Sequence, residues 1–452
     1  MTIRVFLSYF LFLIILMHAY DELIISIQIS MKKYTFILLC VFLFWGNAYA
    51  QRENVISDES KIPAYQLPDV LTRENGRKVK SEKVWFNKRR PEILKLFTNE
   101  VYGAVPGELG IAEVKVWETA DDALNGQAIR KQLSLFFRKN NQNLEVNVLI
   151  YLPKTTQKVP VFLAYNFTGN HAVFNDPAIR LTESWVANNP SVGIINNHIT
   201  EQSRATSEDR WPVEEIIKAG YGLVTIYYGD VDPDKDDFSD GIHPFFYTEG
   251  QTHPASNEWG SIAAWAWGLS RAMDYLEQEP LVDSKKVAVL GHSRLGKAAL
   301  WAGATDPRFA LVISNESGCG GAALSKRIYG ETVQVINTAF PHWFCDNFLQ
   351  YNENEKSLPV DQHMLLALIA PRPLYVASAK GDQWSDPKGE FLSAKYASAV
   401  YELLGLEGLP AKEMPELNHP VMGTIGYHIR SGKHDLNTYD WTQYIGFADK
   451  WF

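Results

Sequence analysis

The chain has 452 residues, of which 46% are hydrophobic and 21% are charged, an ordinary composition for a globular protein with one large α/β domain or two smaller ones. Its net charge of −9 and the lack of a basic run argue against a nucleic-acid partner. There is no glycine-rich phosphate loop or dinucleotide fingerprint, which argues against a nucleotide enzyme.

The first fifty residues differ in composition from the rest. They contain two apolar stretches, and the second begins after MKK at 31–33 and ends in AYA at 48–50. A basic start, an apolar core of about a dozen residues and an A-x-A end are typical of a secretory signal peptide. We therefore expect residues 1–30 to be an artefact of an upstream start, residues 31–50 to be a cleaved signal peptide, and the mature protein to be secreted or periplasmic. A membrane anchor is the alternative.

The chain then passes through an arm, a helix and three strands. Residues 51–80 are polar and proline-bearing, which favours an extended N-terminal arm, and 84–106 have apolar residues at helical spacing that predict a helix ending at Gly103 and Pro106. Three stretches alternate apolar and polar residues, as an antiparallel meander does: 112–119, 128–137 and 144–152.

Continuous apolar runs follow and predict strands buried on both faces of a sheet. They are 159–165, 222–228, 287–290, 309–314 and 374–379. Helical patterns alternate with them, at 213–218, 259–276, 391–404 and 439–452, while 166–210 is polar and predicts loops. Strands alternating with helices predict an α/β fold with a mostly parallel sheet, led by the antiparallel meander. Since no repeat or low-complexity segment interrupts 81–452, we expect one domain there.

The sequence Gly291-His292-Ser293-Arg294-Leu295-Gly296 follows a buried strand and precedes an alanine-rich helix. Strand, sharp turn and helix are the context of the nucleophile elbow of an α/β-hydrolase, in which glycines make room around a strained serine. The second glycine stands one residue later than in G-x-S-x-G. We interpret Ser293 as the nucleophile of a three-layer α/β-hydrolase; an ordinary turn is the alternative.

A serine nucleophile needs a base, and the base needs an acid to orient it. In this fold the order along the chain is serine, acid, histidine. Two acids stand at strand ends after the serine, Glu316 and Asp382, and the sequence leaves both open.

Three histidines follow the acids. His434 lies in a polar turn before the terminal helix, where a loop-borne base belongs, and is our first candidate. His419 in a loop is the reserve, and His428 in a strand pattern is interpreted as a packed residue.

The oxyanion needs hydrogen-bond donors. The backbone N–H of Arg294 supplies one by position, and its side chain is a plausible second donor. Lys297 shares a helix face with the serine and is either a site residue or a surface lysine.

The aspartate-rich sequence within 229–250 lacks the glycine and glutamate of a calcium loop, so we interpret it as an acidic surface loop. Two cysteines follow the leader, Cys319 and Cys345; spacing does not decide whether they pair.

Several motifs together resemble the bacterial branch of the glucuronoyl esterases, carbohydrate esterase family 15, over about residues 80–450. They are G-x-S-R-x-G-K at 291–297, SNESG at 314–318, RIYGETV at 327–333, FPHWFC at 340–345, GDQW at 381–384, and GYHIRSGKHD at 426–435 with YDW at 439–441. The resemblance implies a serine α/β-hydrolase catalytic domain that cleaves the ester between 4-O-methyl-glucuronic acid of xylan and alcohols of lignin, without a metal or other cofactor.

The resemblance also implies roles for residues. Ser293 would be the nucleophile, His434 the base and Arg294 a side chain that helps to hold the oxyanion. Glu316 matches the acid of fungal members and Asp382 an acid used in bacterial ones. The residues that match sugar contacts are Lys297, Glu331 and Trp384. Fungal members have a disulfide-bonded cysteine where His292 stands, so we expect this elbow to lack that brace.

We therefore expect a secreted monomeric serine esterase that acts on glucuronoxylan or lignin-carbohydrate esters, without nucleic-acid or membrane partners after signal cleavage. An acetyl or feruloyl carbohydrate esterase is the alternative within the same chemistry. A carbohydrate-binding hydrolase fold without catalysis is less favoured, because no triad residue is missing.

Overall fold

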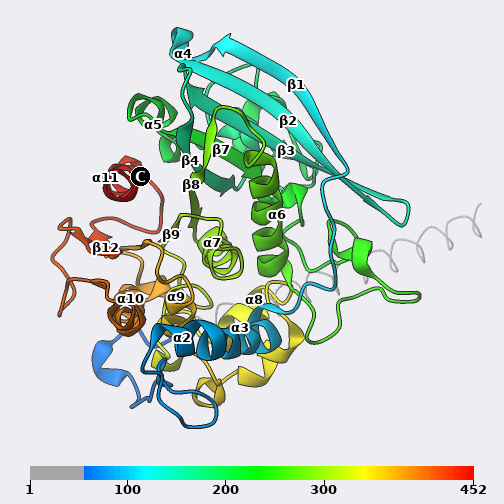
Figure 1. The fold of residues 1–452 in the computed structure, drawn as a ribbon. Coiled ribbons are helices and arrows are strands. Elements are labelled where there is room, and N and C mark those ends of the chain that lie inside the picture. The colour runs from blue at the N-terminus through cyan, green and yellow to red at the C-terminus, as the bar shows by residue number, and fades with distance from the viewer. Residues whose placement is uncertain (1–54) are drawn as a thin grey trace, which may run out of the picture. The chain divides into compact units, whose positions relative to one another are not determined.

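The computed structural model describes residues 55–452 (Figure 1). The expected upstream extension over 1–30, the signal peptide over 31–50 and the first residues of the arm lie outside the described residues. Within 55–452, no helix is both long enough and apolar enough to cross a bilayer.

One sheet of ten strands organises the described chain, in the order β1-β2-β3-β7-β4-β8-β9-β10-β12-β11. β1, β2, β3 and β7 pair antiparallel; the strands from β7 to β12 in this order are parallel, and β11 closes the edge antiparallel. The strands are β1 (Glu113–Asp122), β2 (Ala128–Lys139), β3 (Gln142–Pro153), β4 (Val159–Asn166), β7 (Gly222–Tyr227), β8 (Val282–His292), β9 (Leu311–Asn315), β10 (Leu374–Ala379), β11 (Val421–Met422) and β12 (Ile425–Arg430). The predicted parallel sheet with an antiparallel N-terminal meander is confirmed.

Helices cover both faces of this sheet. In Figure 1, α5 and α11 lie on one face, and α6 and α7 on the other. The helices are α2 (Glu82–Val84), α3 (Arg90–Phe97), α4 (Ala123–Gly126), α5 (Val213–Lys218), α6 (Ser261–Leu276), α7 (Arg294–Thr305), α8 (Val333–Ala339), α9 (Gln362–Ala367), α10 (Pro387–Leu403) and α11 (Thr438–Trp451). A two-stranded ribbon, β5 (Ile194–Ile195) with β6 (His198–Ile199), lies in the long loop before α5. The predicted helix at 84–106 is a run of α- and π-helical turns over 82–102 that ends at Gly103.

The protein has two hydrophobic cores, one on each face of the sheet, and together they explain why the sequences of the central strands are continuously apolar. Successive side chains of a strand point to opposite faces, and β4 shows this directly. Leu163 packs into the core beneath α6 and α7, whereas its neighbour Phe162 packs into the core beneath α5 and α11. Both side chains are fully buried. A three-layer sandwich therefore needs apolar residues at every position of its central strands, with no polar face.

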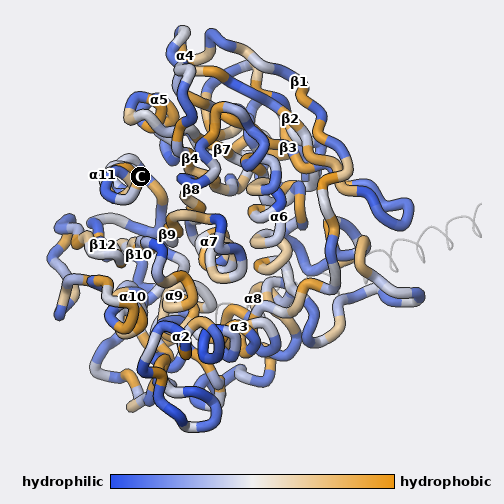
Figure 2. Tube along the Cα trace, in the orientation of Figure 1, coloured by the Kyte–Doolittle hydropathy of each residue, from blue (hydrophilic) through white to orange (hydrophobic). Residues whose placement is uncertain are grey.

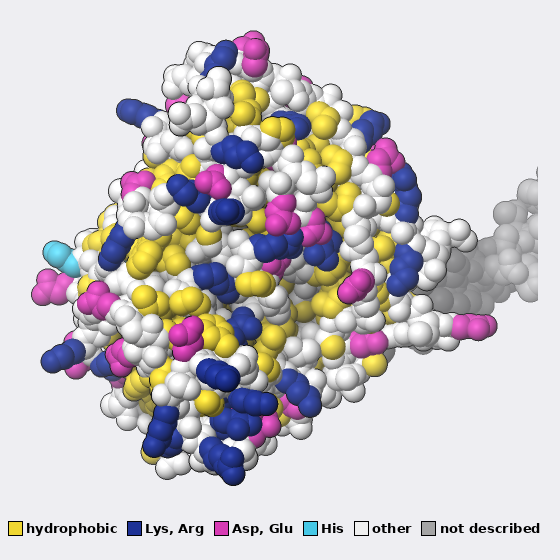
Figure 3. Space-filling view, in the orientation of Figure 1, with side chains coloured by type: hydrophobic (Ala, Val, Ile, Leu, Met, Phe, Trp, Pro, Cys, Tyr) yellow, Lys and Arg dark blue, Asp and Glu magenta, His cyan; other side chains and the backbone are white. Residues whose placement is uncertain are grey.

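The surface follows the usual division of residue types. Figure 2 shows the turn between β2 and β3 as a hydrophilic tip of the antiparallel meander. On the face shown in Figure 3, basic side chains gather over the helical turns that run from α2 to α3, where Lys83, Lys88 and Lys95 are exposed. Aspartate and glutamate side chains also lie on this face.

Candidate active site

The serine turn joins β8 to α7. Ser293 lies between the two elements with φ 58° and ψ −130°, a positive φ that is uncommon for a residue with a side chain. A Cβ atom on Gly291 would lie 1.9 Å from the carbonyl oxygen of Leu295, and one on Gly296 would lie 3.0 Å from that of Gly291. Glycine at both positions therefore lets the first turn of α7 pack against the end of β8. The predicted strand, turn and helix are confirmed.

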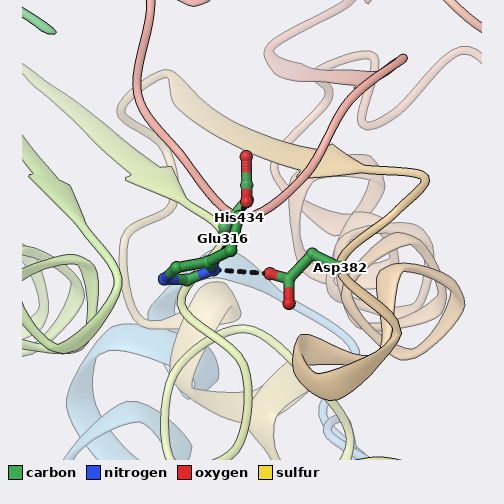
Figure 4. A group of neighbouring side chains, drawn as sticks. All are labelled: Glu316, Asp382 and His434. Carbon is green, nitrogen blue, oxygen red and sulfur yellow. Dashed lines mark hydrogen bonds and ion pairs between the residues drawn. The ribbon is translucent and has the colours of Figure 1, made fainter.

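His434 and both of its candidate acids lie together (Figure 4). The Nδ1 atom of His434 is 2.6 Å from Oδ2 of Asp382 and 3.4 Å from Oε2 of Glu316. The two carboxylates are buried, whereas 40% of the histidine side chain is exposed. The structure thus places two predicted acids around one predicted base, whose imidazole is accessible to solvent.

The imidazole also lies beside the elbow. The rings of His434 and His292 are in contact, with centroids 4.5 Å apart, and His292 directly precedes Ser293. Within residues 55–452 the Ser293 hydroxyl forms no hydrogen bond with His434. Nucleophile–base contacts are often loose without substrate and tighten when it binds.

Sheet topology explains this convergence. Ser293, Glu316, Asp382 and His434 directly or closely follow the ends of β8, β9, β10 and β12. These strands are parallel neighbours, and Asn315 is in register with both His292 and Ala377. Since the carboxyl ends of parallel strands meet at one edge of the sheet, residues 141 positions apart in the chain reach one site.

The two acids have different surroundings. Asp382 accepts the shorter hydrogen bond from His434, and although burial opposes ionisation, this bond holds its pKa below the ordinary value. Glu316 is committed elsewhere, because Oε1 accepts a 2.6 Å bond from Arg430 and Oε2 accepts the backbone N–H of Asp435 at 3.1 Å. Burial raises the pKa of Glu316 to about 7, against the opposing effect of His434 and Arg430. Asp382 is thus the acid better placed to hold the negative charge that orients the base.

The two acids raise the pKa of the candidate base, His434. Burial lowers the pKa of His434, but the hydrogen bonds and charges of Asp382 and Glu316 outweigh burial and raise the pKa to about 9. With Nδ1 occupied by a carboxylate, Nε2 is the nitrogen left to exchange a proton with a reacting group.

The other candidate bases do not reach the site. His428 is fully buried in β12 and bonds Asp440 and Tyr375, as expected of a packed residue. His419 is exposed, and its Nδ1 is 2.9 Å from the carbonyl oxygen of Leu417, two residues away in the same loop. Of the three histidines, only His434 meets an acid predicted to pair with the base.

Arg294 lies at the start of α7, where its backbone N–H has no acceptor within the helix. Its guanidinium is 28% exposed, forms an ion pair with Asp234, and lies 5.1 Å from the centre of the Trp343 ring. Its Nε–H has no hydrogen-bond partner among the described residues. The guanidinium, partly exposed and anchored by Asp234, belongs to the residue that directly follows Ser293, so it is a candidate donor to an oxyanion.

The three predicted sugar contacts form a second group. Lys297 is 3% exposed and donates a 2.6 Å bond to the carbonyl oxygen of Ser317, so the surface-lysine alternative is wrong. Glu331 accepts a hydrogen bond from the Trp384 side chain and feels the charges of Lys297 and His434, while burial raises its pKa. The charges of Lys297 and Glu331 therefore interact across the site, with the lysine ammonium held by a backbone carbonyl.

Comparisons with known proteins identify the family of this chain. A family model for fungal glucuronyl esterases matches residues 199–405. A carbohydrate esterase from an unknown prokaryotic organism is 53% identical over 89% of this chain and 93% of its own length. The chain belongs to carbohydrate esterase family 15.

Solved structures of family 15 members superpose closely on this one. A promiscuous esterase of the family from a marine bacterial metagenome has a TM-score of 0.83 at 53% identity, covering 88% of this chain and 100% of its own. A glucuronoyl esterase from Solibacter usitatus has a TM-score of 0.82 at 49% identity, covering 87% and 100%. This chain is accordingly a carboxylic ester hydrolase of the α/β-hydrolase class.

Sequence reasoning about this family 15 esterase missed Arg430. Its buried guanidinium bonds Glu316 and both oxygens of Asp440, and donates to the backbone carbonyls of the loop that carries His434. These carbonyls belong to Ser431, Lys433 and Asp435, at 3.2, 3.1 and 2.7 Å. Arg430 therefore fixes the path of the histidine loop. Only the motif match marked it, since one arginine at a strand end carries no specific signal.

We expect Arg430→Lys to lower kcat by about 10- to 100-fold with little change in KM, because lysine cannot reproduce the planar fork and a shift of about 1 Å in a catalytic group has an effect of this size. The loss of contacts to buried carboxylates should also lower Tm. Steady-state kinetics and thermal unfolding measure both effects. Lys433→Ala, in the same loop but exposed, is the matched control. Unchanged kcat in Arg430→Lys would contradict the positioning role.

The aspartate-rich loop is a second correction. We expected 229–250 to be an acidic surface loop, but Asp230, Asp232 and Asp234 are buried or nearly so. Asp234 accepts hydrogen bonds from His342, Trp343 and Tyr228 at 2.8 to 2.9 Å besides its ion pair with Arg294. These donors outweigh burial and hold its pKa well below the ordinary value. The expectation therefore holds for Asp236, Asp237 and Asp240, which lie at the surface, but not for these three aspartates, one of which anchors Arg294 beside Ser293.

The elbow has a brace without the disulfide of fungal relatives. His292 is buried beneath His434, and its Nδ1 is 2.8 Å from the amide nitrogen of Asn315. That same amide also donates to the carbonyl of Asp435 at 2.9 Å, in the histidine loop. Burial holds the pKa of His292 well below its ordinary value, so the ring is neutral. The two cysteines whose pairing the sequence left open, Cys319 and Cys345, are free and buried.

The ligand atoms of Glu316, Asp382 and His434 lie within 4.8 Å of one another, a spacing that a metal ion could also use. Here Nδ1 of the histidine is instead engaged by a carboxylate at 2.6 Å, the arrangement of a catalytic acid and base.

Proposed function

We propose that this family 15 esterase hydrolyses esters of glucuronic acid, in particular the ester between (4-O-methyl-)glucuronic acid of xylan and alcohols of lignin. The observation that carries the proposal is that Glu331 lies with Lys297 and Trp384 and also feels the charge of His434, the candidate base. A lysine, a carboxylate and an aromatic side chain at one site suit the hydroxyls and the ring face of a sugar acid. Relatives support it, among them a 4-O-methyl-glucuronoyl methylesterase from Schizophyllum commune, 29% identical over 82% of this chain and 81% of its own length.

In the first half of the reaction, Oγ of Ser293 attacks the C6 carbonyl carbon of the uronate ester while Nε2 of His434 takes the hydroxyl proton. The carbonyl oxygen becomes an oxyanion, stabilised by the backbone N–H and the guanidinium of Arg294. The intermediate then breaks its bond to the alcohol oxygen. The alcohol leaves with the proton from His434, and the uronoyl group stays on Ser293.

In the second half, His434 removes a proton from water, and the hydroxide formed attacks the acyl-enzyme carbonyl. Breakdown of this second intermediate returns the proton to Oγ of Ser293 and releases glucuronic acid. Asp382 keeps the imidazole oriented and stabilises its positive charge in both halves.

Export from the cytoplasm is part of the proposal, because lignin-carbohydrate esters are extracellular polymers and residues 31–50 have the pattern of a signal peptide. Expression of the full-length protein followed by N-terminal sequencing of the secreted product tests it. A first residue of Gln51 is expected; retention of residues 31–50 would contradict it.

The test of the function compares benzyl glucuronate with p-nitrophenyl acetate as substrates of the purified protein. We expect kcat/KM for the uronate ester to exceed that for the acetate, because only the uronate can use the sugar contacts. Strong acetate hydrolysis without glucuronate hydrolysis would retain the serine esterase and overturn the uronate assignment in favour of an acetyl esterase. Hydrolysis of neither ester would overturn both.

A further inference from the structure

The start of the described chain lies against the loops that carry the candidate sugar contacts. The carbonyl oxygen of Ile56 accepts the backbone N–H of Gly330 at 2.9 Å, and that of Ser57 accepts the Tyr329 hydroxyl at 3.0 Å. Glu331 directly follows Gly330 in the chain. The arm thus reaches within one peptide bond of a residue assigned to the substrate.

The 328–331 loop in turn contacts the 382–386 loop, which carries Trp384. The Tyr329 hydroxyl is 2.5 Å from Oε1 of Gln383, and the backbone N–H of Glu331 donates to the carbonyl of Trp384 at 2.9 Å. A Cβ atom on Gly330, whose φ is +63°, would lie 2.4 Å from that Trp384 carbonyl. Arm, 328–331 loop and 382–386 loop therefore form three layers in direct contact.

A charged cluster clamps the three layers from the side. Arg327, with 4% of its side chain exposed, bonds the buried Asp386 at 2.8 Å and also pairs with Glu59 of the arm. Glu59, which is 45% exposed, binds Lys388 as well, at 2.9 Å. The Glu59 carboxylate thereby connects Arg327, which precedes the 328–331 loop, to Lys388 in the first turn of α10.

Both loops adopt backbone conformations that need support. Ile328 has φ 52° and Asp386 has φ 50°, values uncommon for residues with side chains and especially for a β-branched one. Such conformations persist where the surroundings fix them. Here the surroundings include the arm. Ile328 lies between Arg327 and Tyr329, and the arm binds both of these neighbours. Asp386 in turn forms an ion pair with Arg327.

We propose that residues Ile56–Glu59 are a positioning element for the substrate site: the arm holds the loops of Glu331 and Trp384 in the conformation that binds the sugar acid. The inference rests on the proposed function, because it assigns to the arm the affinity for the uronate rather than the acyl transfer. These residues touch no reacting group, so they position and do not catalyse.

The test uses two variants that loosen the arm, Glu59→Ala and Tyr329→Phe, with Lys61→Ala as the matched control. Lys61 is exposed in the same short helical turn, and among residues 55–452 its one ion pair is with Asp58, at 3.9 Å. For benzyl glucuronate we expect KM to rise about 5- to 20-fold in each variant with kcat within threefold, since binding is weakened without loss of the catalytic groups. Hydrolysis of p-nitrophenyl acetate, which has no sugar, should change less than twofold.

Amide hydrogen exchange supplies a readout without substrate. Exchange at 328–331 and 382–386 should become faster in Glu59→Ala than in Lys61→Ala, while α7 remains protected. Unchanged KM and exchange would overturn the proposal, and so would an equal loss on both esters, which would mean that the arm supports the triad instead. If the unsubstituted protein does not hydrolyse the uronate, the proposed function fails, and the exchange rates still decide whether the arm holds the loops.

Discussion

Replacing Ser293 by alanine is expected to lower kcat for benzyl glucuronate by about 10⁴-fold or more, because no other group can form the acyl-enzyme and the remaining rate would come from binding and the oxyanion donors alone. Alanine keeps the Cβ atom, so the positive φ of the elbow is neither relieved nor worsened. Tm should therefore stay within a few degrees of the unsubstituted protein.

The matched control is Ser284→Ala, a serine near the opposite end of the same strand, β8. It should retain activity within about twofold, since partly exposed positions away from a site tolerate such changes. A Ser293→Ala protein that still hydrolysed the uronate ester at more than a hundredth of the normal rate would remove Ser293 from the role of nucleophile.

Asp382→Asn is expected to reduce kcat by about 10²- to 10⁴-fold, whereas Glu316→Gln should reduce it less than tenfold. The neutral amide that replaces the Asp382 carboxylate cannot hold the imidazole in the required tautomer or stabilise its charge. Glutamine at position 316 keeps a carbonyl oxygen that can accept the hydrogen bond of Arg430, the shorter of the two that Glu316 accepts, although its NH2 group cannot accept the Asp435 N–H. The reverse order of effects, measured by steady-state kinetics, would make Glu316 the principal acid.

The pH profile separates the two acids further. A general base must be neutral, so kcat/KM should rise with pH until His434 has lost its proton, near its pKa of about 9. In Asp382→Asn this limb should move toward the ordinary histidine value of about 6.5, because the carboxylate that favours the charged imidazole is gone. An unmoved limb would contradict the assignment of Asp382 as its partner.

The raised pKa of His434 also makes the stability of the fold depend on pH. The folded protein raises the pKa of His434 above its unfolded value, so the imidazolium–carboxylate contact stabilises the fold fully below about pH 6.5 and its contribution is lost as pH rises through about 9. The free energy of unfolding should therefore fall more between these values in the unsubstituted protein than in Asp382→Asn.

The elements and the turn that carries Ser293 could be predicted from the sequence because their signals are local. Apolar runs at 159–165 and 222–228 needed only neighbouring residues to identify buried strands, and the glycines around Ser293 needed only the turn that they permit. The alternation of strands and helices predicted a parallel sheet, and the acids were sought at the ends of its strands. His434 and both acids were found in this way.

The rest depended on contacts between residues far apart in the chain. Sequence spacing could not show that Arg430 binds Glu316 and leaves the closer contact with His434 to Asp382. Nor could it show that Asp234 of the 229–250 loop turns inward to bind Arg294. It could not show that the arm reaches the substrate loops. The sequence by itself determined the fold class, the candidate nucleophile and the set of its candidate partners, since these follow from periodicity, turn chemistry and chain order. Only the tertiary structure decided which carboxylate faces the base and what holds the site in place, because burial and hydrogen bonding at a distance set the charge and position of each group.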